Sequence, residues 1–148
     1  MQRQKGFSVI ELMVTLIIIS IIAGISVSVY LNMKPQLRLN GAARQVMGDL
    51  ANARMKAISQ NNEYKIFFVD NHQYQILDDN DNDGTIDSGE EVTTRDIQTE
   101  YYDTTFSATA NPIFHPRGNA APSTSITLTN PAGEKTITVS IAGRIKIN

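Results

Sequence analysis

The first feature along the chain is a long apolar run close to the N-terminus. A short polar leader containing Arg3 and Lys5 ends at Gly6, and residues 12–29 are almost all apolar. The stretch from residue 7 to residue 31 meets the requirement of about 20 residues for a helix that crosses the hydrocarbon core of a bilayer. We therefore expect a transmembrane helix over residues 7–31.

Beyond this run, residues 37–60 place apolar side chains at intervals of three or four, which is typical of a helix with one buried face. The expected buried positions are Leu39, Ala43, Val46, Met47, Leu50, Ala53, Ala57 and Ile58. The other face carries Arg38, Arg44, Asp49 and Lys56. Pro35 predicts a kink or a brief break, and Asn61 and Asn62 predict the helix end, because asparagine tolerates the left-handed conformation. The sequence thus predicts an amphipathic helix over residues 32–62.

From residue 63 onward the apolar period changes to two, as in β-strands. We predict strands over residues 64–69, 73–77, 91–97, 99–107, 125–129, 135–141 and 144–147. Residues 113–115 lie between Pro112 and Pro116, and proline is confined to the edges and bulges of sheets. We expect a short edge strand or an ordered loop there. The expected fold class is α+β: a long N-terminal helix packed on a C-terminal antiparallel β-sheet domain over residues 63–148.

The composition changes this picture in two ways. The chain has no cysteine, so packing or a metal ion must hold the β domain together. The net charge of −2 is unevenly distributed, because residues 78–91 hold a dense group of acidic side chains. The rest of the β domain and the amphipathic helix is mildly basic, and the acidity is therefore concentrated in one loop.

This acidic loop has the spacing of a calcium-binding loop. Residues 79–90, DNDNDGTIDSGE, fit the pattern D-x-D-x-D-G-x-I-D-x-x-E. The predicted ligands are the side chains of Asp79, Asp81, Asp83, Asp87 and Glu90 and the carbonyl of Thr85. Gly84 permits the sharp turn that brings these oxygens together. The alternative is a solvated turn, because Asp, Asn and Gly all favour turns. We expect a structural Ca²⁺ that orders the loop between two strands.

One charged residue, Glu11, interrupts the membrane segment. A carboxylate inside a membrane helix costs roughly 2.5–3.5 kcal/mol on insertion scales, so it needs a partner. We expect that partner outside this chain. A secretory signal peptide would have a shorter apolar core with a small-residue cleavage site on its far side. A plain anchor would explain the length of the run but not the pair Gly6-Phe7 or Glu11.

The stretch G-F-S-V-I-E-L-M-V-T-L at residues 6–16 resembles the class III signal of type IV prepilins and pseudopilins. The resemblance implies that a prepilin peptidase removes the leader, residues 1–6, after Gly6. Phe7 then becomes the N-methylated mature N-terminus, and Glu11 is the assembly glutamate that pairs with the N-terminal ammonium of a neighbouring subunit. Arg3 and Lys5 place the leader in the cytoplasm by the positive-inside rule. The β domain is then expected in the periplasm, anchored in the bacterial inner membrane.

Two further stretches resemble the GspH/FimT family. The helix carries its pattern at Asp49, Leu50, Ala53, Arg54, Ala57 and Ile58, and residues 113–118 and 142–147 resemble its C-terminal end. The family contains the H-type minor pseudopilin of type II secretion and FimT-like minor pilins. The resemblance implies a structural minor subunit of a type IV pilus or a type II secretion pseudopilus. Its expected partners are other pilin or pseudopilin subunits, the prepilin peptidase and the inner membrane assembly platform.

Two other filament functions stay open. Some FimT-like proteins bind DNA during uptake, and a basic C-terminal G-R-x-R element is associated with that activity. Residues 143–146 match it in part through Arg144 and Lys146, and Arg117 is a further cation, although all three also fit ordinary solvated positions. The chain could instead be a major filament subunit. Major type IV pilins often carry a C-terminal disulfide loop, however, and this chain has no cysteine.

Enzyme chemistry has little support in the sequence. The two histidines, His72 and His115, stand in a predicted turn and between prolines, respectively. The chain has no cysteine nucleophile, and no serine stands in a G-x-S-x-G elbow. We therefore expect a structural protein that has no catalytic residues.

Overall fold

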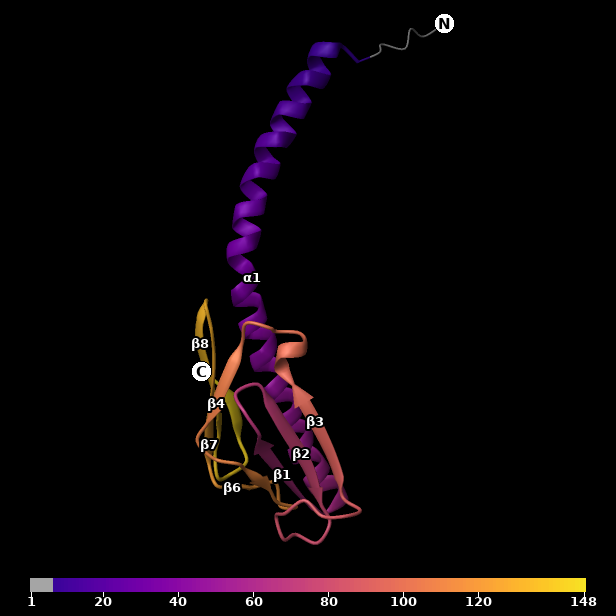
Figure 1. Cartoon of the computed structure of the whole chain (residues 1–148), viewed down its shortest axis with the longest axis vertical. Coiled ribbons are helices and arrows are strands. Elements are labelled where there is room, and N and C mark those ends of the chain that lie inside the picture. The colour runs from indigo at the N-terminus through magenta and orange to yellow at the C-terminus, as the bar shows by residue number, and fades with distance from the viewer. Residues whose placement is uncertain (1–6) are drawn as a thin grey trace, which may run out of the picture. The chain divides into compact units, whose positions relative to one another are not determined.

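The computed structural model describes residues 7–148 and forms two compact units, Met1–Lys34 and Pro35–Asn148. One helix, α1 (Val9–Gln60), runs through the boundary between them (Figure 1). Pro35 lies inside α1, so the predicted brief break is wrong. Proline removes one helical hydrogen bond, and the side-chain amide of Asn130 donates to the Pro35 carbonyl over 2.7 Å at this turn. The α-helix is nevertheless continuous through the proline.

The C-terminal end of α1 matches the sequence prediction. Asn61 follows the last helical residue with a φ of 57°, in the left-handed region. The backbone N–H of Asn62 then donates to the carbonyl of Ala57 over 3.2 Å and so satisfies one free carbonyl of the last turn. The first strand then begins at Glu63.

Pro35–Asn148 has the predicted α+β fold, with two antiparallel sheets where the sequence predicted a single β-sheet domain. The first sheet has the order β3-β2-β1-β5-β6 and the second has the order β4-β7-β8-β9 (Figure 1). The strands are β1 (Glu63–Phe68), β2 (Gln73–Asp79), β3 (Glu91–Asp96), β4 (Thr105–Ala108), β5 (Ile113–Phe114), β6 (Ala120–Ala121), β7 (Thr124–Asn130), β8 (Gly133–Val139) and β9 (Ile145–Ile147).

The predicted strand over residues 99–107 is wrong in its first half. A 3₁₀ turn (Ile97–Thr99) follows β3, and the side chain of Asp96 caps it by accepting from the Gln98 N–H over 2.8 Å. The chain then forms a loop, and β4 begins only at residue 105. Local side-chain hydrogen bonds of this kind compete with strand formation.

The prediction of an edge strand at residues 113–115 is also wrong. β5 is an interior strand, because it pairs with β1 on one side and with β6 on the other. It contains two residues only, and Pro112 and Pro116 both lie outside it. Neither proline therefore interrupts the ladder, and the Pro112 carbonyl accepts a hydrogen bond from Ile66 over 3.0 Å.

The core lies between the second half of α1 and the two sheets. The buried face of the helix consists of Leu39, Ala42, Ala43, Val46, Leu50, Ala53 and Ala57. The periodicity predicted all of these except Ala42, whereas the predicted Met47 is only partly buried and the predicted Ile58 is 49% exposed. The first sheet contributes Tyr64, Ile66, Tyr74 and Phe114, and the second contributes Phe106, Ile126, Leu128, Ile137 and Val139. Alanine on the helix face lets the helix lie close to the strands, which keeps the packing dense.

Two residues predicted on the solvent face of the helix instead contact the β domain. Asp49 accepts a hydrogen bond from the hydroxyl of the buried Tyr74 over 2.5 Å. Burial raises the pKa of Tyr74, and the Asp49 carboxylate raises it further. Arg38 donates to both carboxylate oxygens of Asp103, from Nε over 2.7 Å and from Nη2 over 2.6 Å. These polar contacts fix the helix to the start of β2 and to the loop before β4.

Arg54, Gly118 and Gly143 come from three distant parts of the sequence and meet at one junction. The Arg54 Nε donates to the Gly118 carbonyl over 2.8 Å. A Cβ on Gly143 would lie 1.9 Å from that same carbonyl oxygen and 2.8 Å from the Arg54 Nε. The junction therefore joins the helix to the turn after β5 and to the turn between β8 and β9. The resemblance placed all three residues within its motifs, and the contacts give them a packing role.

The Arg38–Asp103 pair predicts a specific pH dependence of stability. The guanidinium of Arg38 lowers the pKa of Asp103 in the folded protein. The pair therefore stabilises the fold above the usual Asp pKa of about 3.9, and this stabilisation is lost as the pH falls through the lowered pKa. We expect the difference in unfolding free energy between the parent and Asp103→Asn to be constant from pH 5 to 7 and to shrink below about pH 4. Urea unfolding between pH 3 and pH 7 measures it.

A second variant provides the control for this experiment. Arg38→Met removes the cation and should abolish the same pH-dependent term while leaving the Asp103 carboxyl in place. A difference between the parent and Asp103→Asn that stays constant down to pH 3 would contradict the assignment.

Candidate assembly helix and metal-binding loop

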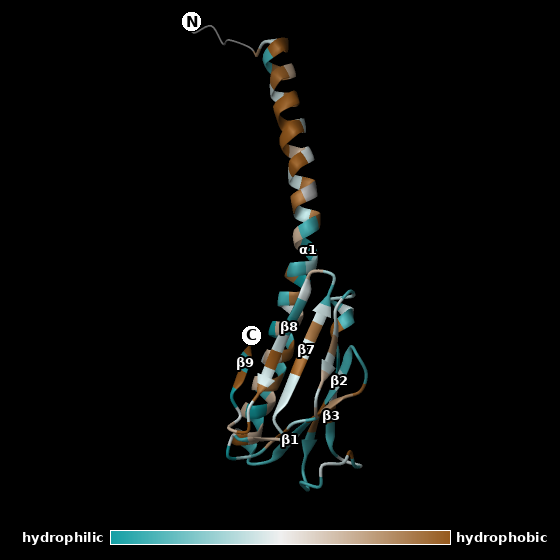
Figure 2. Ribbon diagram, turned by 90° about the vertical axis from the view of Figure 1, so that its left-hand side faces the viewer, coloured by the Kyte–Doolittle hydropathy of each residue, from teal (hydrophilic) through white to brown (hydrophobic). Residues whose placement is uncertain are grey.

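The N-terminal half of α1 exposes a continuous apolar surface. Each large apolar side chain from Phe7 to Met33 is at least half exposed in the isolated chain, and Phe7 is 82% exposed. In Figure 2 this part of the helix is mostly hydrophobic (brown) on the side that faces the viewer. Within the part of the chain that the structure describes, α1 is the one helix long and apolar enough to cross a membrane. An apolar surface of this kind needs a bilayer or other apolar helices around it.

Three hydroxyl groups in this segment form hydrogen bonds within the helix itself. Thr15 donates to the Leu12 carbonyl over 2.9 Å, and Ser20 donates to the Leu16 carbonyl over 2.7 Å. Ser26 forms the same kind of bond with a carbonyl four residues earlier, over 2.8 Å. Internal bonding is the arrangement required in a bilayer core, where water is absent as a partner. The small polar residues are thus compatible with a membrane-spanning helix.

Glu11 lies in the first turn of α1 and is exposed. A carboxylate at this end of a helix interacts favourably with the helix dipole. Its exposure leaves it accessible to a cation supplied by another molecule. Phe7 precedes the helix, whereas Gly6 and the rest of the predicted leader, residues 1–6, lie outside the described residues. The cleavage between Gly6 and Phe7 therefore stays a prediction.

The acidic loop connects β2 to β3, where the sequence predicted it. It lies at the same end of its unit as the C-terminus of α1 (Figure 1). Asp79 stands at the end of β2 and is 0% exposed. Its Oδ2 accepts from the backbone N–H of Gly84 over 2.8 Å, whereas its Oδ1 has no hydrogen-bond partner among residues 7–148. Burial raises the pKa of the Asp79 carboxyl.

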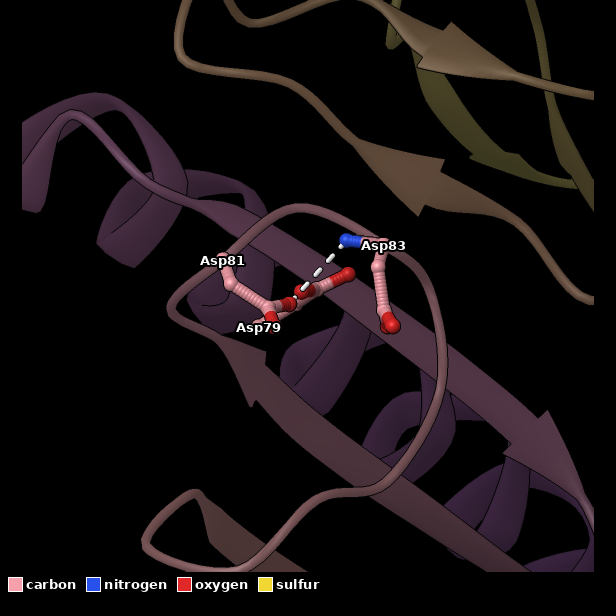
Figure 3. Close-up of side chains that lie close together, drawn as sticks. All are labelled: Asp79, Asp81 and Asp83. Atoms are coloured by element: carbon pink, nitrogen blue, oxygen red, sulfur yellow. Dashed lines mark hydrogen bonds between the residues drawn. The ribbon is translucent and has the colours of Figure 1, made fainter.

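Three of the predicted ligands come together in this loop. Asp79, Asp81 and Asp83 each offer a carboxylate oxygen, and these oxygens lie within 4.8 Å of one another. Figure 3 shows the carboxylates of Asp79 and Asp81 next to each other, with Asp83 on the returning arm of the loop. One oxygen of Asp81 accepts from the Asp83 N–H over 3.2 Å, and one oxygen of Asp83 accepts from the Thr85 N–H over 2.7 Å. The hydrogen bonds from Thr85 lower the pKa of Asp83.

The structure does not bring the other predicted ligands into this close group. The Oε1 of Glu90 accepts from the Asn80 N–H and its Oε2 accepts from the Asp87 N–H, both over 2.9 Å. Glu90 therefore closes the loop through backbone amides. The hydroxyl of Thr85 lies 3.3 Å from a carboxylate oxygen of Asp87. Gly84 has a φ of 76°, which the predicted sharp turn requires.

The loop is bound to the rest of its unit by contacts that sequence reasoning missed. The Nζ of Lys65 donates to the Gly84 carbonyl over 2.6 Å. The backbone N–H of Glu63 donates to the side chain of Asn82 over 3.2 Å. The side-chain amide of Asn62 donates to Asp78 over 2.6 Å and to Asn80 over 3.2 Å. The asparagines between the acids therefore connect the loop to the end of α1 and the start of β1.

The three basic residues considered for DNA contact are all exposed. Arg117 lies in the turn between β5 and β6, and Arg144 and Lys146 flank Ile145 at the start of the edge strand β9. Exposure is what phosphate contact requires, and it is equally the property of ordinary solvated strand residues. DNA binding therefore stays a prediction of the sequence.

Comparison with protein families gives two matches. Residues 42–143 match the family model of type II transport protein GspH, and residues 1–27 match the prokaryotic N-terminal methylation motif. A search of curated protein sequences finds no match. The two family matches together cover both ends of α1 and most of the β domain.

Solved structures with a similar fold include two minor filament subunits. The type IV minor pilin FimU of Pseudomonas aeruginosa is 19% identical with a TM-score of 0.62, and the similarity covers 76% of this chain and 90% of that one. The minor pseudopilin EpsH from the type 2 secretion system of Vibrio cholerae is 10% identical with a TM-score of 0.59, covering 75% of this chain and 96% of that one. At these identities the similarity concerns the fold.

Proposed function

We propose a route into a filament for this chain, which belongs to the family of type II transport protein GspH. It is a structural minor subunit of the pilin and pseudopilin class. The observation that carries the proposal is the exposed apolar half of α1 with a single carboxylate in its first turn. Such a surface is stable inside a membrane and, after extraction, inside a bundle of similar helices.

The first step of the proposed route is maturation at the membrane. A prepilin peptidase removes residues 1–6 on the cytoplasmic side, and Phe7 becomes the N-methylated N-terminus. Arg3 and Lys5 precede the apolar run, which supports a cytoplasmic leader and a periplasmic β domain. The chain is then an inner membrane protein with one spanning helix until the assembly platform extracts it.

The second step is docking into the filament through Glu11. After the cut, Glu11 is separated from the new N-terminus by three residues, and its carboxylate pairs with the ammonium group of a neighbouring subunit. A buried carboxylate is tolerated when a cation meets it with good geometry. The filament is a type IV pilus or a type II secretion pseudopilus, and the β domain contacts neighbouring subunits at its surface.

A catalytic role is not part of this proposal, because the family is a structural one. Both histidines have carboxylate neighbours at separate places in the β domain. The Nδ1 of His72 lies 3.1 Å from Asp96, and the Nδ1 of His115 lies 2.7 Å from Glu63. These contacts hold a turn and a strand end in place.

The route is tested by expressing the full chain in a host with an active prepilin peptidase. We expect intact-mass spectrometry to show a protein that begins at Phe7 and carries one additional methyl group. We expect Glu11→Ala to be cleaved normally but to be strongly depleted in sheared filaments. The physical reason is that the variant still fits the membrane but gives no counter-charge to its neighbour.

Glu134→Ala is the matched control, because Glu134 is an exposed carboxylate in β8. This variant should enter filaments as the parent does. Purification of a chain that retains residues 1–6 would exclude the maturation step. Equal amounts of the parent and Glu11→Ala in filaments would exclude the docking step.

A further inference from the structure

We propose that residues 79–90 bind one Ca²⁺ and that the bound ion fixes this loop to the end of α1. The buried Oδ1 of Asp79, which has no hydrogen-bond partner within residues 7–148, points to a ligand. A buried polar group without a partner is costly, and an ionised carboxylate is more costly than a neutral group. A bound cation would supply the missing interaction.

The backbone of the loop already holds the carboxylates in place for such an ion. Asp79, Asp81 and Asp83 each direct one oxygen to a backbone N–H of the loop, so each side chain is fixed and keeps a second oxygen free. Their ligand oxygens lie within 4.8 Å of one another. Without an ion, three carboxylates at this separation repel one another. A cation bound between them would offset this repulsion.

The donor set selects the kind of ion. It consists of carboxylate and carbonyl oxygens only, which are ligands for hard cations. Ca²⁺ takes six to eight oxygens in a flexible arrangement, whereas Mg²⁺ demands a near-ideal octahedron and keeps several of its waters. The loop offers more carboxylates than Mg²⁺ normally uses, and it is exposed at Asp81 and Asp83. We therefore assign the site to Ca²⁺.

Binding requires one rearrangement in the loop. The two oxygens of Glu90 now accept from the Asn80 and Asp87 amides. For Glu90 to coordinate the ion, at least one of these bonds must lengthen as its carboxylate turns inward. The Thr85 carbonyl and the Asp87 side chain supply further oxygens as the loop closes. The affinity is then that of an extracellular module, with a Kd of about 10⁻⁴–10⁻³ M.

The contacts around the loop extend the effect of the ion beyond it. Asn82 and Gly84 lie inside the loop and bind Glu63 and Lys65 of β1. Asn62 binds Asp78 and Asn80 on either side of Asp79. An ion that orders the loop therefore also orders the junction between α1 and β1. The ion acts as a structural support for this end of the domain.

The site is tested with the full chain in detergent micelles after removal of metal with EGTA. We expect calorimetric titration with CaCl₂ to give one site with a Kd of about 10⁻⁴–10⁻³ M. Because a ligand that binds only the folded state stabilises it, 10 mM CaCl₂ should raise the Tm by about 4–10 °C. The same concentration of MgCl₂ should raise it by less than half as much.

Three variants in the loop and one control outside it connect this response to the loop. Asp81→Asn and Asp87→Asn change exposed residues, so the fold is kept, and each should raise the Kd for Ca²⁺ by about 10-fold or more. Glu134→Gln changes the charge by the same amount at an exposed position in β8 and should leave the Kd unchanged. Asp79→Asn should fold in EGTA and should lose the rise in Tm with Ca²⁺.

Hydrogen exchange measures the coupling to the helix end. Calcium should slow exchange in peptides that cover residues 61–66 and 79–91 and should leave residues 124–139 unchanged. No heat at 10 mM CaCl₂ together with an unchanged Tm would overturn the site. An equal loss of affinity in Asp81→Asn and Glu134→Gln would overturn its assignment to this loop. Slowing confined to residues 79–91 would overturn the coupling to the turn at the end of α1 and to β1.

Discussion

Gly143→Ala is expected to lower the unfolding free energy of the β domain by about 2–6 kcal/mol. The new Cβ would lie 1.9 Å from the Gly118 carbonyl oxygen and 2.8 Å from the Arg54 Nε. Gly143 also has a φ of 74°, where a side chain is strained by roughly 1–3 kcal/mol. Overpacking of this kind typically costs a further 1–3 kcal/mol or so. Since domains are stable by only about 5–15 kcal/mol, much of this reserve would be lost.

Two other glycines separate the clash from the strain. Gly133 has a φ of 133° with nothing within 4 Å of an added Cβ, so Gly133→Ala should show the strain alone, roughly 1–3 kcal/mol. Gly48 lies in α1 with the same open surroundings, so Gly48→Ala should raise the unfolding free energy by up to about 1 kcal/mol. Urea unfolding of the full chain, followed by circular dichroism, measures all three variants. If Gly143→Ala cost no more than Gly133→Ala, the turns that contain Gly118 and Gly143 could move apart without loss of stability. That result would contradict the expected clash.

The second large effect is expected for Phe114→Ala. Phe114 is 0% exposed, and its strand β5 is paired on both sides. Truncation of a buried phenylalanine costs about 3–5 kcal/mol, because a cavity remains where the ring was. We expect a reduction of this size in the same urea experiment. An exposed ring at this position would give a smaller effect, so the measurement tests the burial of Phe114.

Phe114→Leu and Phe67→Ala are the controls for this prediction. Leucine keeps most of the buried volume, so Phe114→Leu should cost less than half as much as the alanine variant. Phe67 lies on the other face of β1 and is partly exposed, with the Lys65 ammonium 4.5 Å from its ring centre. Phe67→Ala should therefore cost about 1 kcal/mol. Equal costs for the two alanine variants would contradict the interior placement of Phe114.

The parts of the fold that could be predicted from the sequence depend on local pattern. The buried face of α1 follows from apolar residues at helical spacing, and Leu39, Val46 and Leu50 are buried as expected. The first hairpin follows from alternation, and its turn is held by Asp70, which accepts from the N–H groups of His72 and Gln73. The sharp turn at Gly84 follows from the loop pattern. In each case the determining contacts lie close together in the sequence.

The parts that could not be predicted depend on contacts between distant residues. β5 became an interior strand because β6, only two residues long, pairs with it, and so short a strand has no readable pattern. The division into two sheets depends on which strands pair, and this is not encoded in the alternation of any single strand. The role of Arg54 depends on a carbonyl 64 residues away. The helix pattern included Arg54 but gave no sign of this partner.

The candidate metal-binding loop was also predictable only in its local features. The spacing of acids indicated the loop, and the structure adds the buried oxygen of Asp79 and the asparagine contacts to residues 62 and 63. The spacing also suggested six ligands around one point, whereas three lie together and Glu90 binds amides.

The alanine-lined face of α1 has a consequence for how sequences of this kind can diverge. Ala42, Ala43 and Ala57 are 0% exposed, so a longer apolar side chain at any of them would act as a wedge between helix and strands. Arg44 and Lys56 project from the opposite side and meet no such limit. Substitutions should therefore accumulate on the outward side of the helix. The residues that contact neighbouring subunits can change there while the residues that face the strands stay the same.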